Sequence, residues 1–266
     1  MFSRFMDDIH FKTSIDVAHI RKSCQIVEKT ICYLSSFIHE GITTLELDNL
    51  AGDFLKKHHC RSAIKGHQGY PAHICTSVNQ VAAHGVPDHC RLKQGDLLSI
   101  DIAVEYNGWY GDGAWTFWVD KQGRHPLVAA AWKSLIAGIA AVRAGNTLGD
   151  VGEAVSNMAR RLGYYVVEDF VGHGIGQQLH EGPKVPHIGK SGQGITIKPG
   201  MVFTIEPALV TINSPLTLLT DQWSLKADQA LSAQFEQTIA VFKDRIEILT
   251  LSSKKLLKSI DYPPEI

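Results

Sequence analysis

Apolar residues recur at steps of three and four near the start of the chain, which is the spacing of one face of a helix. They are Ile20, Cys24, Val27, Ile31, Leu34 and Ile38. This pattern predicts an amphipathic helix over residues 14–40 that ends at Gly41. Thr43, with Glu46 three residues later, forms a capping box and predicts a second helix running to about His59.

A second helix pair is predicted further along the chain. Pro126 suits the first turn of a helix that ends at Gly145, and Thr147 can cap a helix that ends at Gly163. After each pair comes a His-Gly dipeptide, and then a strand that begins with glycine and carries one acidic residue. The first set is His84-Gly85 with residues 95–101, and the second is His173-Gly174 with residues 200–206.

This repeated order predicts an α+β chain made of two related halves that face each other. The halves span about residues 14–120 and 126–250. A long loop at residues 181–198 is expected as an insertion in the second half.

One strand of the first half directs an aspartate toward a candidate site. Alternation of apolar and polar positions places Asp101 on the less apolar face of its strand. Asn107-Gly108 is a strong signal for a two-residue hairpin loop. With that loop, Asp101 lies opposite Ala114, and Asp112 shares its face at a diagonal position about 7–8 Å away, within reach of a common ion.

Two carboxylates on a half-buried face are costly unless a positive charge neutralises them. The sequence has no Lys or Arg between Lys93 and Lys121, so a bound cation is the simplest partner. Three further ligands lie in strand context: His173, Glu206 and Glu236. Taken singly, such residues more often face solvent or form a hydrogen bond in the core.

Together the five side chains form an oxygen-rich set without a thiolate, larger than a tetrahedral structural zinc site requires. The set favours a pair of Mn²⁺, Fe²⁺, Co²⁺ or Zn²⁺ ions, among which ligand type alone does not choose. Two such ions supply hydroxide at neutral pH and polarise a carbonyl, so the predicted chemistry is hydrolysis.

Composition narrows the class of protein. The 266 residues are 44% apolar with a net charge of −1, which suits one large globular domain over residues 1–266 and gives no field for nucleic acid or an anionic membrane. The longest apolar helical stretch, residues 127–142, is shorter than a bilayer crossing. The start lacks the pattern of a secretory signal, so we expect a cytoplasmic protein. Five cysteines, an odd number without CxxC spacing, disfavour a disulfide framework.

Several longer strings carry a family resemblance. They are GYPAHICTSVNQVAAHGVPD, GDLLSIDIAV, GHGIG, LHE, PGMVFTIEP and SAQFEQTIAV. Through them the sequence resembles the type I methionine aminopeptidases of the bacterial kind, from about residue 14 to residue 250. The resemblance implies the pita-bread fold, with two pseudo-symmetric halves whose antiparallel sheet is covered by two helix pairs. It also implies removal of the N-terminal methionine from proteins and peptides, with preference for a small second residue, by a hydroxide that two metal ions activate.

The resemblance also assigns roles to single residues. It places Asp101, Asp112, His173, Glu206 and Glu236 on the metal-ligand positions. It makes Glu206 the proton shuttle, His84 a contact to substrate, and His180 a contact to the scissile carbonyl. It places the methionine side-chain pocket at Tyr70, Cys75, Leu179 and Trp223, and a monovalent cation near Asn79, Val81 and Ser232.

The sequence departs from the family pattern close to these positions. Leu179 stands where an aromatic residue is typical, His67 where a tyrosine is common, and Gly113 where a threonine or serine is usual. Gln177 and Gln178 replace small or basic residues, and Ala103 replaces a threonine. Supporting residues can change metal affinity or rate by about 10 to 100-fold, so turnover and strictness for methionine stay open.

Two alternatives remain beside this reading. One is another pita-bread hydrolase, such as a proline-directed aminopeptidase, which is disfavoured because those proteins normally carry a large extra N-terminal domain. The other is a catalytically weak or non-hydrolytic paralogue that binds nascent chains or another partner. Loss of a metal ligand would favour the paralogue, and none is lost. We expect a monomer acting on peptide or nascent-protein N-termini; contact with the ribosome is left open.

Overall fold

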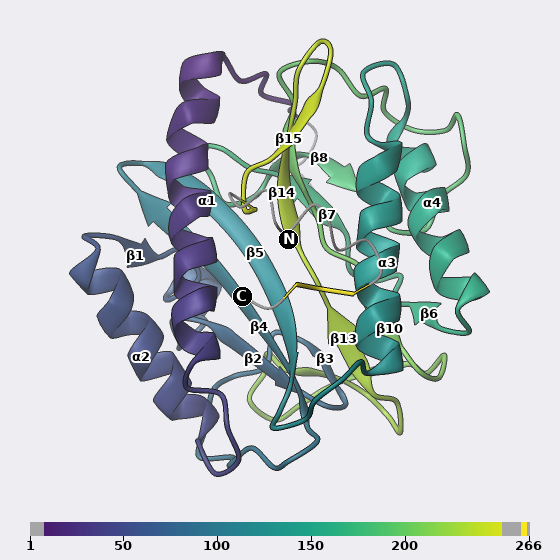
Figure 1. Ribbon diagram of the computed structural model, residues 1–266. Helices are drawn as coiled ribbons and strands as arrows, with labels where there is room; N and C mark the ends of the chain where they lie inside the picture. Colours follow the sequence, from purple (N-terminus) through teal and green to yellow (C-terminus); the bar gives the residue numbers. More distant parts are fainter. Residues whose placement is uncertain (1–7, 252–261, 265–266) are drawn as a thin grey trace.

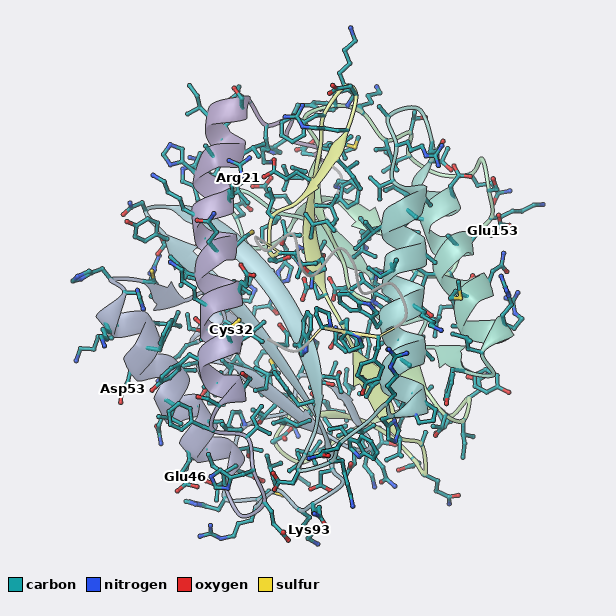
Figure 2. The ribbon with its side chains drawn as sticks, viewed as in Figure 1. Arg21, Cys32, Glu46, Asp53, Lys93 and Glu153 are labelled. Atoms are coloured by element: carbon teal, nitrogen blue, oxygen red, sulfur yellow. The ribbon has the colours of Figure 1, made fainter. Side chains whose placement is uncertain are left out.

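The structure is a computed structural model that describes residues 8–251 and 262–264. Its four α-helices in this range form two pairs, α1 with α2 and α3 with α4, which flank the strands in Figure 1. Their bounds are α1 Ser14–Ser35, α2 Thr44–Lys57, α3 Pro126–Ala141 and α4 Leu148–Arg161. Figure 2 shows the acidic side chains of Glu46 and Asp53 on α2 pointing outward, away from the strands.

The predicted helix starts are confirmed. Thr43 and Glu46 form the capping box of α2, and Pro126 occupies the first turn of α3. Thr147 caps α4, with Asp150 completing the box. These caps satisfy backbone N–H groups that the first turn of a helix leaves without partners.

The predicted helix ends were too late. α1 ends at Ser35 rather than residue 40, because the following backbone donors bond elsewhere: the Glu40 N–H to the Asp120 carboxylate and the Gly41 N–H to the Leu92 carbonyl. Ile38 still packs on the core, which explains why the apolar spacing continued past the helix. α2 ends at Lys57, α3 at Ala141 and α4 at Arg161, each two to four residues before the predicted end.

The strands form antiparallel sheets. The first half holds β1 Arg61–Ser62, β2 Cys75–Val78, β3 Val81–Ala83, β4 Leu97–Tyr106 and β5 Trp109–Trp118, besides the short 3₁₀ helix His67–Gly69. The second half holds β6 Tyr165–Val166, β7 Gly172–Gly174, β8 Glu181–Val185, β9 Val202–Ile205, β10 Ala208–Val210, β11 Leu216–Leu218, β12 Leu225–Ala227, β13 Ser232–Gln234, β14 Gln237–Val241 and β15 Ile246–Ile248.

Two of these sheets position the site. In one, β4 pairs with β5 along its whole length on one edge and with β2 and β1 on the other. In the other, the strand order is β15-β14-β9-β7-β8. An isolated bridge between Ala114 of β5 and Glu236, just before β14, joins the two.

The prediction of a loop over residues 181–198 was partly wrong. Its first residues form β8, which pairs with β7 so that Lys184 lies opposite His173. β8 forms by pairing with β7, a strand that the local pattern does not reveal. Pro183 lies inside β8, and a proline at that position disfavours the prediction of a strand.

Buried apolar residues of both halves form one large cluster between the helices and the sheets. It includes Leu47 of α2, Ile100 of β4, Trp132 of α3, Val155 of α4 and Phe203 of β9. Because both helix pairs pack into the same cluster, the sheets between them are held in one arrangement. Within the described residues, no helix is both long and apolar enough to cross a membrane. The basic segment at residues 252–258 lies outside the described residues.

Candidate metal centre

The β4–β5 hairpin places two aspartates on one face. Asn107 and Gly108 form its loop, both with positive φ (53° and 80°). Asp101 lies opposite Ala114 and Asp112 opposite Ala103, which is the predicted register. Asp112 is buried and accepts a hydrogen bond from the Gly113 N–H at 3.0 Å. The two carboxylates are therefore held at diagonal positions by the backbone ladder.

A histidine from the second half faces these aspartates. The Nδ1 of His173 donates to the Gly174 carbonyl at 3.0 Å, which leaves Nε2 as a lone-pair donor. That Nε2 lies 3.6 Å from Oδ2 of Asp112 and 3.6 Å from Oε1 of Glu206. Burial lowers the pKa of His173 to about 4, so the ring is neutral and suited to bind a metal ion.

Glu206 follows directly after β9 and is oriented by a hydroxyl. The Thr204 hydroxyl donates to Oε1 of Glu206 at 2.7 Å and accepts the His173 N–H at 3.0 Å. Thr204 thereby links the two ligand candidates. The spacing of two residues puts Thr204 and Glu206 on one face of the strand, a signal that the sequence already contained.

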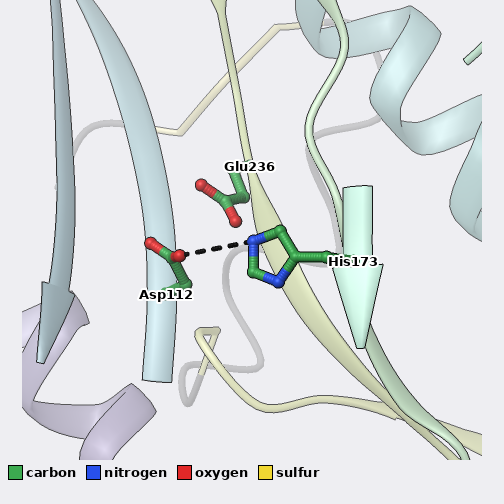
Figure 3. A group of neighbouring side chains, drawn as sticks. All are labelled: Asp112, His173 and Glu236. Atoms are coloured by element: carbon green, nitrogen blue, oxygen red, sulfur yellow. Dashed lines mark ion pairs between the residues drawn. The ribbon is translucent and has the colours of Figure 1, made fainter. Parts of the chain in front are cut away.

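Glu236 completes the cluster: Figure 3 shows its carboxyl group beside both Asp112 and the His173 ring. One potential ligand atom from each of Asp112, His173 and Glu236 lies within 4.8 Å of the other two. All three side chains are buried, at 6%, 5% and 2% exposure. Among the described residues, Oε1 of Glu236 has no hydrogen-bond partner. An orphaned buried carboxylate oxygen is costly, and a cation would satisfy it.

The electrostatics of the acidic groups also fit a cation. Burial raises the pKa of Asp101 to about 7. Burial, followed by repulsion from neighbouring carboxylates, raises the pKa values of Asp112, Glu206 and Glu236 well above their usual range. Within the described residues, the basic side chain within 4.0 Å of these carboxyl groups is His173, whose neutral ring leaves their charge without compensation. The residues present therefore fit divalent ions held by oxygen and imidazole ligands.

Three further histidines lie beside this cluster. The His180 ring is 4.4 Å from the His173 ring and 5.4 Å from the His67 ring, measured between centroids. His84 has a positive φ of 55° and packs 5.9 Å from the Phe170 ring. Burial lowers the pKa of both His84 and His180, so both rings are neutral near pH 7.

The four expected pocket residues do not form one cluster. Tyr70 and Cys75 are buried together, and the Trp223 ring meets the Tyr70 ring edge-on at 5.2 Å. Leu179 instead belongs to a separate apolar cluster built around Val17, Ile20 and Cys24. Ile64 packs against both clusters and was not predicted.

The comparisons with known proteins agree with this geometry. The family model described as metallopeptidase family M24 matches residues 18–243, most of the chain. The chain belongs to metallopeptidase family M24. Its methionine aminopeptidase relative from Rickettsia prowazekii is 38% identical over 261 residues, covering 96% of this chain and 99% of the relative. Methionine aminopeptidase A from Synechocystis is 41% identical over 249 residues, covering 92% and 98%.

Solved structures confirm the fold. The Rickettsia prowazekii methionine aminopeptidase structure matches with a TM-score of 0.89 at 37% identity, covering 92% of this chain and 100% of that one. The prolidase from Pyrococcus furiosus matches with a TM-score of 0.72 at 20% identity, over 66% of its own length, which shows the fold alone. The predicted pita-bread, α+β architecture is thus confirmed, and membership of this metallopeptidase family implies divalent metal ions.

His187, which was not predicted from the sequence, lies against Glu206. It is 1% exposed; its Nδ1 donates to the Phe170 carbonyl at 3.1 Å, and its Nε2 accepts the Glu206 backbone N–H at 3.0 Å. Burial lowers the pKa of His187 to about 4, so Nε2 stays an acceptor. His187 lay inside the expected loop, and only the folded chain brings it to Glu206.

Proposed function

We propose that this M24 metallopeptidase is an aminopeptidase that removes the N-terminal methionine from proteins and peptides, with preference for a small second residue. The convergence of Asp112, His173 and Glu236 on one point, within 4.8 Å, carries the proposal. Relatives named methionine aminopeptidase, 36–41% identical over most of the chain, support the substrate.

Five residues would hold two divalent ions: Asp101, Asp112, His173, Glu206 and Glu236. Bound there, the ions would lower the pKa of water and polarise the scissile carbonyl. Mn²⁺, Fe²⁺, Co²⁺ and Zn²⁺ are the candidates, since all accept carboxylate and imidazole ligands.

The proton transfers are assigned to Glu206. Its carboxyl lies 3.6 Å from Nε2 of His173, and in its ionised form it would take a proton from the attacking water and give it to the leaving amine. The Thr204 hydroxyl and the His187 ring fix its side chain and backbone, respectively. A fixed carboxyl loses less entropy on reaching the reacting atoms.

Two neutral histidines would hold the substrate. His180 lies against His173 and would donate a hydrogen bond to the oxyanion that develops on the carbonyl. His84, which packs on Phe170, would contact the peptide. The pair remains uncharged near pH 7 because burial lowers both pKa values.

The cluster of Tyr70, Cys75 and Trp223 would accept the methionine side chain. The Tyr70 hydroxyl donates to the Gly85 carbonyl at 2.9 Å, and this bond fixes the Tyr70 ring. Gly85 directly follows His84 in the chain. Leu179 would line the site from its separate cluster.

A monovalent cation is proposed near Asn79, Val81 and Ser232. The Ser232 N–H donates to the Asn79 carbonyl at 2.7 Å, which places these two segments of the chain side by side. Among the described residues, the buried Ser232 hydroxyl has no hydrogen-bond partner, and a bound cation would use it.

Because newly made chains carry the methionine, we further propose a cytoplasmic monomer that acts on nascent N-termini, free or at the ribosome.

The test is release of free methionine. Metal-stripped protein is incubated with Met-Ala-Ser and Met-Pro peptides and with Mn²⁺, Fe²⁺, Co²⁺ or Zn²⁺ in turn. We expect release of methionine only when metal is present. A peptide that begins with leucine should release little leucine. No release with any ion from well-folded protein would overturn the proposal in favour of a non-hydrolytic binding protein.

A further inference from the structure

The segment before α1 lies against the strands that carry the metal centre. The Lys12 N–H donates to the Gly200 carbonyl at 2.7 Å, and Ile9 forms a parallel bridge with Gly182 at the start of β8. The segment is therefore part of the sheet region and not only the approach to a helix.

Lys12 makes a buried ion pair there. Its Nζ contacts Oε2 of Glu181, and both side chains are only 6% exposed. Nζ also donates to the His10 carbonyl at 2.8 Å, and Oε1 of Glu181 accepts the Gln178 N–H at 3.1 Å. The pair is satisfied on both sides, which is the condition under which a buried ion pair is tolerated.

The surroundings leave this pair little room to move. A Cβ added at Gly176 would lie 2.5 Å from Cε of Lys12 and 2.7 Å from Oε1 of Glu181. The Gly176 carbonyl in turn accepts the Tyr110 N–H at 2.9 Å. Gly176 thus lies directly against the ends of the Lys12 and Glu181 side chains, and the loop between β7 and β8 contacts both Lys12 and β5.

That loop carries two residues of the proposed site. Residues 175–180 connect His173 on β7 to Glu181 on β8, and they include Leu179 and His180. His180 is the direct chain neighbour of Glu181. The backbone of Glu181 is thus joined directly to the residue whose ring lies 4.4 Å from the His173 ring.

We propose that Lys12 is a positioning residue, which through its buried ion pair with Glu181 holds the loop of residues 175–180 so that His180 faces the substrate side of the metal centre. The reason is that a buried carboxylate without its partner is strongly disfavoured, so the loop would move to bring Glu181 to water. The consequence for turnover rests on the proposed function; the effect on the loop does not.

The test replaces Lys12 by methionine, which keeps the length of the side chain and removes the charge. In metal-loaded full-length protein, we expect kcat for Met-Ala-Ser to fall about 30 to 100-fold, because misplacing a catalytic group costs on this scale. KM should change less than about threefold and the metal content should not change. Hydrogen exchange should speed up at residues 175–181, including the Gln178 N–H, and stay unchanged in β9 and β14.

Arg21→Met is the matched control. Arg21 also joins the first helix to the second half, through Glu247 at 2.6 and 2.9 Å, but its side chain is about one third exposed (Figure 2 labels it on α1). We expect wild-type kcat and wild-type loop exchange. If Lys12→Met does not fold, as judged by exchange in β9 and β14, Lys12→Gln replaces it with the same expected direction.

A double-mutant cycle identifies the partner. Glu181→Gln alone should slow turnover, and the Lys12→Met/Glu181→Gln double variant should lose no more than the worse single variant. Losses that multiply, or a Lys12→Met protein with wild-type loop exchange, would overturn the proposal. If wild-type protein releases no methionine, the proposed function fails, whereas the exchange measurements still decide whether Lys12 holds the loop.

Discussion

Asp101 and Asp112 occupy diagonal positions on one face of the β4–β5 hairpin, because Asp101 pairs with Ala114 and Asp112 with Ala103. The hairpin ladder thus fixes two carboxylates before any ion binds. His173, Glu206 and Glu236 approach the same face from the second half. The proposed centre therefore depends on the packing of the two halves, and its candidate ligands are held by different sheets.

Asp101→Asn tests the contribution of the first half. We expect turnover to fall by more than about 100-fold, the upper end of what a mere supporting residue costs, together with reduced metal occupancy. Kinetics of methionine release and elemental analysis measure the two effects. Asp53→Asn, on the exposed face of α2, is the control and should match wild type. Unchanged activity of Asp101→Asn would refute its assignment as a ligand.

The metal-free protein should lose stability as pH rises between about 6.5 and 8. Folded-state pKa values are raised for Asp101, to about 7, and for Asp112, Glu206 and Glu236. In this window the unfolded chain has already released these protons and the folded one has not, so deprotonation opposes folding. Below about pH 6.5 the carboxyl groups alone no longer decide whether stability rises or falls with pH. The buried His173 and His187 have lowered pKa values, so their contribution to stability increases as pH rises.

Thermal unfolding checks this pH dependence. We expect the Tm of metal-free protein to fall by at least about 4 °C from pH 6.5 to pH 8, which corresponds to about 1–2 kcal/mol for a chain of this size. Added metal should abolish the fall, since an ion stabilises the carboxylates. A metal-free Tm that is flat or rises over this range would contradict the clustering of the four acids.

His187→Phe tests the support of Glu206. Removing the acceptor leaves the Glu206 N–H without a partner, at a cost of about 1–3 kcal/mol in the free energy of unfolding. We expect kcat to fall about 10 to 100-fold with the metal still bound. Denaturant unfolding and methionine release measure these changes. His125→Phe, at the start of α3 beside Trp118, is the control and should keep wild-type kcat; equal effects of both variants would refute a specific role for His187.

His180→Ala tests the proposed contact to the scissile carbonyl. Loss of one oxyanion donor typically costs about 10² to 10³-fold in kcat. We expect that loss with unchanged metal content, because His180 is not among the proposed ligands. His58→Ala, on the exposed end of α2, should be neutral. A His180→Ala protein that loses its metal would instead place His180 among the ligands.

Local sequence signals were sufficient for the hairpin and the helix starts. Asn107-Gly108 determined the register of Asp101 and Asp112 because a two-residue loop leaves one way to pair the strands. Thr43 and Thr147 marked helix starts because capping is made by neighbours in the chain.

The same local signals do not predict contacts between separate segments of the chain. β8 forms by pairing with β7, and its proline hides it from a local pattern. The bond from Glu206 to His187 spans nineteen residues, and the pair of Lys12 with Glu181 spans 169. Leu179, assigned to the pocket by resemblance, belongs to another apolar cluster than Tyr70 and Cys75, and Ile64 packs against both clusters, an arrangement that only the folded chain reveals.

Elemental analysis of the folded, metal-supplemented protein tests the central claim most directly. After removal of free ions, the wild-type protein should retain two equivalents of a divalent transition metal per chain, and Asp112→Asn should retain one or none. Wild-type protein that keeps its fold and retains no transition metal would contradict the metal centre and the hydrolytic function derived from it.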